Sequence, residues 1–88
     1  MVVINRKLRP AQTLQVVRRA ARRRGWTVVE VAGRGKGSHQ LYAVVDERGE
    51  HLGRLVVPQR PRELSWVVLR SIESGLASLF GHQWMEEQ

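Results

Sequence analysis

Apolar residues recur every three to four positions in the first third of the chain and mark one face of a helix. Between Pro10 and Arg24 they share that face, whereas arginines occupy the opposite one. Pro10 suits a first helical turn, and Gly25 suits the stop after a last turn rich in cations. We therefore predict an amphipathic helix over residues 10–24, with the apolar face Leu14, Val16, Val17, Ala20 and Ala21 and the polar face Arg18, Arg19, Arg22 and Arg23.

β-branched and aromatic residues dominate the middle of the chain, in the segments 26–32, 39–45 and 51–58. Each segment predicts a short strand. The Asp and Gly of "DERGE" at 46–50 are typical of a tight hairpin turn, so the second and third strands are expected to pair antiparallel. A glycine-rich segment joins the first strand to the second, and the strands together predict a meander.

Helical spacing returns after the prolines at positions 58 and 61, over "ELSWVVLRSIESG" at 63–75. Gly75 is expected either to cap this helix or to break it before one more turn in "LASLF" at 76–80. The tail at 81–88 is polar apart from Trp84 and Met85, and it is expected to be loosely ordered.

The order of these elements predicts an α+β fold. It is expected to be a two-layer α-β-β-β-α sandwich, in which two helices cover one face of an antiparallel three-stranded sheet and the other face stays open to solvent. A chain of 88 residues holds one core, so we predict a single domain over 1–88 with its core at about 10–80.

The net charge of the chain limits the kinds of molecule that the protein is expected to bind. The chain has 15 Lys and Arg against 8 Asp and Glu, a formal net charge of +7, and all of its cations except Lys7 and Lys36 are arginines. Guanidinium groups suit bidentate contacts with phosphate, so a polyanion is the expected partner. The arginine face of the first helix is either a solvated surface or a nucleic-acid contact, and spacing alone favours the solvated surface.

Cysteine usage and hydropathy indicate the cellular compartment in which the protein is expected. The chain has no cysteine, no apolar run of membrane-spanning length, and no secretory signal in its first residues. We therefore expect a soluble cytoplasmic protein without a membrane partner.

The stretch "GRGKGSHQLY" at 33–42 places glycines, two cations and a histidine at the start of the second predicted strand. A Walker-type phosphate loop needs its lysine after the last glycine and then a helix, whereas here Lys36 precedes Gly37 and a strand follows. A minor-groove arm would need a flanking proline that is missing. The remaining prediction is a site at His39, where glycines let the backbone approach a ligand and Arg34 and Lys36 supply positive charge.

Histidine suits proton transfer near neutrality because its ordinary pKa is about 6.5. From spacing alone, a surface histidine without chemistry is favoured over a catalytic one. The three histidines are scattered and include no helical pair four residues apart, so no metal site is predicted.

Four motifs that follow one another along the chain favour a catalytic His39 over a surface histidine without chemistry. They are Gly-Trp at 25–26, Gly-Ser-His-Gln-x-Tyr at 37–42, Val-Pro at 57–58, and Leu-Arg-Ser-Ile with its downstream Gly-Leu at 69–76. Together they resemble the HicA family of toxin mRNA interferases over nearly the whole chain. The resemblance implies a double-stranded-RNA-binding-domain-like fold, a catalytic residue at His39, an mRNA substrate, no nucleotide or metal cofactor, and inhibition by a HicB-type antitoxin that covers the active site.

The chain departs from that family at two places. Family members commonly have a histidine shortly after Val-Pro, where this chain has Arg60, and the segment before His39 is longer and richer in cations. A two-histidine acid/base pair is therefore not implied. Either Arg60 acts as an electrostatic clamp instead, or the chain is a weak or degenerate nuclease.

These observations predict a metal-independent endoribonuclease of a type II toxin-antitoxin system, in which His39 removes the proton of a ribose 2′-hydroxyl. Lys36 is the preferred phosphate contact, and Ser38 is favoured for a local structural role. The candidate substrate-binding residues are Arg34, Lys36, Ser38, Arg54 and Arg60.

The aromatic residues are expected to be structural. Tyr42 shares a strand with His39 but faces the other way, so it is expected in the core, and Trp26 and Trp66 are expected in the core or at a subunit contact. Two alternatives to the enzyme stay open. One is a non-catalytic RNA- or DNA-binding module that binds backbone phosphates with the arginine helix and the glycine-rich loop; the other is a subunit whose main role is to bind an acidic antitoxin.

Overall fold

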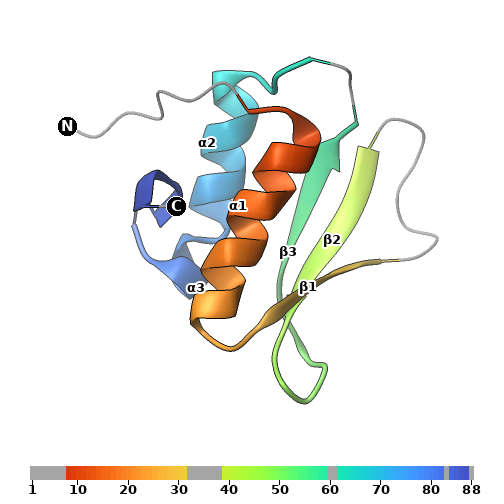
Figure 1. Cartoon of the computed structure of the whole chain (residues 1–88), viewed down its shortest axis with the longest axis vertical. Helices are drawn as coiled ribbons and strands as arrows, with labels where there is room; N and C mark the ends of the chain where they lie inside the picture. Colours follow the sequence, from red (N-terminus) through yellow and green to blue (C-terminus); the bar gives the residue numbers. More distant parts are fainter. Residues whose placement is uncertain (1–7, 32–38, 60–61, 83, 88) are drawn as a thin grey trace.

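The sheet is an antiparallel meander in the order β1-β2-β3. The computed structural model describes residues 8–31, 39–59, 62–82 and 84–87. Figure 1 shows its strands, which are β1 (Thr27–Glu30), β2 (His39–Val45) and β3 (His51–Pro58). The predicted meander is confirmed, and the second and third strands begin and end at the predicted residues.

The hairpin between β2 and β3 forms as its sequence predicts. Asp46 Oδ1 accepts the backbone N–H groups of Arg48 and Glu50, both at 2.9 Å. Gly49 adopts a φ of 81°, in the left-handed region that favours glycine. A short polar side chain and one glycine therefore close the turn.

The helices are α1 (Pro10–Arg23), α2 (Trp66–Gly75) and α3 (Ala77–Phe80), followed by a 3-10 turn, η1 (Trp84–Glu87). α1 begins at the predicted proline. Ser65 caps α2, because its side-chain oxygen accepts the N–H of Val68 at 3.2 Å. The expected break after Gly75 is also confirmed, since the chain resumes a helical turn as α3.

One face of the sheet packs against the helices and forms the core. Alternate strand residues supply this inner face, namely Val28, Tyr42, Val44, Leu55 and Val57. The helices contribute Val16, Val17, Ala20, Ala21, Leu69 and Ile72. Gly53 belongs to the inner face too, and a Cβ there would meet Leu79 Cδ1 at 2.8 Å, so α3 approaches the backbone of β3 closely. The molecule is thus a small α+β domain with helices on one face of its sheet.

The C-terminal segment departs from the prediction. Trp84 and Met85 are among the most deeply buried side chains, so the expectation of a loosely ordered tail is wrong for them. Glu73 of α2 holds them in place: its carbonyl oxygen accepts the Trp84 Nε1–H at 2.8 Å, and its buried carboxylate accepts the Met85 N–H at 3.1 Å. Trp84 also meets Phe80 edge-on, with ring centroids 4.9 Å apart.

The other two tryptophans differ from each other. Trp26 is half-buried and packs against the core, as expected. Trp66 is 54% exposed, so of the two expected places, the core or a subunit contact, the core is excluded and the subunit contact stays a prediction. It occupies the first turn of α2, one residue after the cap, whereas the buried stripe of that helix consists of Leu69, Ile72 and Glu73.

We expect Trp84→Ala to destabilise the protein strongly and Trp66→Ala, the matched control, to have little effect. Removing a fully buried indole costs about 3–5 kcal/mol, whereas substitutions at exposed positions usually stay within about 0.5 kcal/mol. In a domain of this size each kcal/mol moves Tm by roughly 4–8 °C. Thermal unfolding followed by circular dichroism measures both variants. Equal changes in Tm would contradict the burial of the C-terminal turn.

Candidate functional site

His39 is the first residue of β2, and its side chain is exposed. Its cross-strand partner is Pro58, the last residue of β3. Side chains alternate along a strand, so His39 faces away from the helices while Tyr42 faces the core. The expected opposition of these two residues, and the burial of Tyr42, are confirmed.

The face that carries His39 is called here the outer face of the sheet. Its described residues include Thr27, Val29, His39, Leu41, Ala43, Arg54 and Val56. The His39 side chain is accessible from solvent. An imidazole in such a place can take a proton from a bound hydroxyl group.

The predicted substrate-binding residues are only partly within the described structure. Arg34, Lys36, Ser38 and Arg60 lie outside the described residues. Arg54 lies on the outer face and is exposed, but it pairs with Ala43, four positions along β2 from His39. That separation corresponds to about 13 Å along the strand. The structure therefore does not bring Arg54 beside His39.

The outer face is unexpectedly apolar. Val29 is 37% exposed and Val56 is 48% exposed, and half-buried Leu41 lies between their strands. An antiparallel sheet with one open face usually shows polar residues there. Sequence reasoning missed this surface, although a signal exists: "TVV", "LYAVV" and "LVV" are continuous apolar runs, which is the pattern of strands covered on both sides.

The other histidines lie elsewhere. His51 pairs with Val45 at the hairpin end of β2, and His82 follows α3; both are exposed. Within the described residues, no group of three or more His, Cys, Asp or Glu side chains is placed to hold a metal ion. Among the helices of that same part of the chain, none combines the length and the apolar character needed to cross a bilayer.

Comparisons of the chain with protein-family models, with curated proteins and with solved structures find no match. The site is therefore described by its own geometry, an exposed imidazole where β2 begins, on a largely apolar sheet face.

The strand register, which places His39 on the outer face, can be tested with two neighbouring valines of β3. Val57→Thr puts a hydroxyl group into the core and is expected to lower the free energy of unfolding by about 1–3 kcal/mol. Val56→Thr makes the same chemical change on the outer face and is expected to cost about 0.5 kcal/mol or less. Urea unfolding measures both. A larger loss for Val56→Thr would mean that β3 turns its other face to the helices; with the pairing of His39 and Pro58 kept, His39 would then face the helices too.

Proposed function

We propose that this protein is an RNA-cleaving toxin of the HicA type, an mRNA interferase of a type II toxin-antitoxin system. The observation that carries the proposal is the exposed His39 at the start of β2, directly after the basic glycine-rich segment 33–38. A buried imidazole at this position would have excluded a nucleotide. The part of the first motif that the structure describes, His39 to Tyr42, and the Val-Pro motif at 57–58 belong to two strands that pair with each other.

The fold supports the same proposal. The order of α1, three antiparallel strands and α2, with the helices on one face, is compatible with the double-stranded-RNA-binding-domain-like fold that the HicA resemblance implies. We propose that finer assignment for this chain. It places the strand that begins with His39 in the centre of the sheet, where pairing on both sides fixes the backbone.

In the proposed reaction His39, in its neutral form, takes the proton of a ribose 2′-hydroxyl group. The 2′-oxygen attacks the adjacent phosphorus, the bond to the 5′-oxygen breaks, and the leaving oxygen takes a proton from water. The products are a 2′,3′-cyclic phosphate end and a 5′-hydroxyl end. The proposed phosphate contacts are Lys36, Arg34 and Arg60, and Ser38 is proposed to have a local structural role. The mechanism needs neither a metal nor a nucleotide cofactor.

The proposed protein partner is a HicB-type antitoxin that covers the outer face in the cytoplasm. An exposed apolar surface around Val29 and Val56 suits a protein contact, because burying it removes nonpolar area from water. The net charge of +7 favours an acidic partner. A partner on this face would also block access to His39.

The proposed cleavage is tested with His39→Ala and, as the matched control, His51→Ala. Wild type is expected to cut a defined RNA but not its all-DNA counterpart, because the nucleophile is the 2′-hydroxyl group. Since a positioned general base contributes about 10²–10⁴ in rate, His39→Ala is expected to lose at least about a hundredfold while keeping most of its RNA affinity. His51→Ala changes an exposed histidine at the start of β3, beside the end of β2 opposite to His39, and is expected to cleave normally. Gel analysis of the products, with identification of the ends, gives the readout.

Three results would contradict the nuclease. They are full cleavage by His39→Ala, an equal loss in His51→Ala, and cleavage of the DNA. Salt-sensitive RNA binding by wild type without any cleavage would instead support the non-catalytic RNA-binding module.

The antitoxin surface is tested by adding a negative charge to it. Val56→Glu places a carboxylate on the outer face, and Val67→Glu places one on α2, where Val67 is exposed. When each toxin is co-expressed with the product of the neighbouring reading frame, growth is expected to be rescued for Val67→Glu and poorly rescued for Val56→Glu. Equal rescue of both, at equal toxicity alone, would contradict an antitoxin seated on the outer face.

A further inference from the structure

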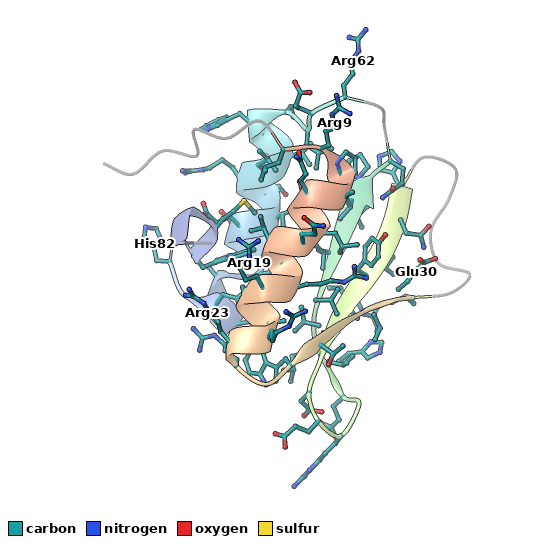
Figure 2. All side chains as sticks on the ribbon, in the orientation of Figure 1. Arg9, Arg19, Arg23, Glu30, Arg62 and His82 are labelled. Atoms are coloured by element: carbon teal, nitrogen blue, oxygen red, sulfur yellow. The ribbon has the colours of Figure 1, made fainter. Side chains whose placement is uncertain are left out.

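The C-terminal half of α1 presents a dense group of arginines to solvent. Arg18, Arg19, Arg22 and Arg23 are all exposed, and the sequence of α1 contains no Asp or Glu. Figure 2 shows the labelled Arg19 and Arg23 on α1, with the carboxylate of Glu30 across the molecule from them. The only ion pair found among the described residues joins Arg9 to Glu63, so the four exposed arginines have no carboxylate partner in that part of the chain.

This arrangement is unfavourable for the helix by itself. Arg18 and Arg22, like Arg19 and Arg23, are four residues apart, where like charges repel each other. The negative end of the helix dipole offsets part of this repulsion for the last turn. An anion bound across these side chains would offset the remaining repulsion between the arginines.

The surface around these arginines is shaped as well as charged. A hollow of about 400 Å³ is lined by Gln15, Arg18, Arg19 and Arg22. A second hollow, of about 300 Å³, is lined by Arg18, Arg22, Trp26, Thr27 and Val28. Since Arg18 and Arg22 line both, the hollows form one continuous surface from α1 to the start of β1, called here the arginine surface.

Trp26 gives this surface an aromatic element. Its ring is half-buried, with the Arg24 guanidinium carbon 5.9 Å from the ring centroid and the Phe80 ring centroid 6.1 Å away. Arg24 is fixed in turn, because its Nη2 donates to the carbonyl oxygen of Phe80 at 3.1 Å. The indole is therefore held at the edge of the second hollow, beside two exposed guanidinium groups.

We propose that the arginine surface is a second RNA-binding site, which holds the phosphates of a single-stranded segment away from the cleavage site. Guanidinium groups four residues apart on a helix are spaced by about 6 Å along its axis, which allows them to contact successive phosphates of one strand. Arginines that follow a backbone, next to an aromatic ring that can stack on an unpaired base, are the usual elements of single-strand recognition. The choice of RNA over DNA rests on the proposed function.

The position of the surface gives it a role distinct from that of His39. Figure 1 shows the α1–β1 turn and the β2–β3 hairpin at one end of the molecule, and the start of β2 at the other. A strand bound at the arginine surface therefore anchors long RNA without touching the bond that reacts. Loss of the anchor is expected to raise KM for long RNA and to leave kcat, and the cleavage of a short oligonucleotide, unchanged.

The test compares two double variants that remove the same charge. Arg18→Gln with Arg22→Gln changes the arginine surface, and Arg48→Gln with Arg70→Gln changes the exposed hairpin and α2. Both are made in the His39→Ala background, so that a labelled single-stranded RNA stays intact during fluorescence anisotropy. For the first double variant we expect an affinity loss of about tenfold and a slope of log K against log salt that is smaller by about 1.4, for two lost phosphate contacts. The second is expected to lose about twofold. Glutamine preserves helix propensity, and circular dichroism confirms that both variants are folded.

Two outcomes would overturn the proposal. Equal losses in both double variants would show that net charge alone attracts the RNA. Binding of poly-glutamate with the same affinity and the same dependence on Arg18 and Arg22 would assign the surface to an acidic protein instead. The anisotropy measurement does not require cleavage, so failure of the proposed nuclease and failure of this anchor are read out separately.

Discussion

The register between β2 and β3 decides which side chains of the sheet face the helices and which face solvent. Because side chains alternate, a slip of one residue in β2 would turn Tyr42 outward and His39 inward, and the same slip in β3 would turn Val57 outward. Burial holds the register on the inner face, where Tyr42 lies opposite Leu55. The hairpin holds it at the other end, through the two N–H groups that Asp46 accepts. The exposure of His39 therefore depends on apolar packing on the opposite side of the sheet.

Most of the fold could be predicted because its signals are local. Helical and strand periodicities, a proline at the start of α1 and an Asp-Gly turn are all readable within a few residues. The C-terminal turn could not be predicted in this way, because the buried Trp84 donates its Nε1–H to the carbonyl oxygen of Glu73, eleven residues earlier in the chain. Trp66 could not be assigned to the core or to a surface contact from its size alone, because its position in the first turn of α2 leaves it outside the buried stripe of that helix.

The candidate site was predictable only where alternation along a strand was sufficient. The rule of two residues per repeat placed His39 and Tyr42 on opposite faces before the fold was known. It could not place Arg54 relative to His39, because their separation is set by the register between two strands. It also could not identify the apolar outer face. When both faces of a strand are apolar, alternation disappears, and Val56 and Val57 cannot be told apart without the helices that cover one of them.

The proposed antitoxin surface and the proposed RNA anchor are centred on different layers of the molecule and meet at Thr27. The outer face belongs to the sheet side that the helices leave uncovered, whereas the arginine surface extends from the exposed side of α1 to the start of β1. A protein that covers Val56 and His39 therefore leaves Arg18 and Arg22 exposed. Under both proposals, inhibition of cleavage would not require displacement of the RNA. The positive charge of α1, which weakens an isolated helix through repulsion, would then serve binding in both the free and the inhibited protein.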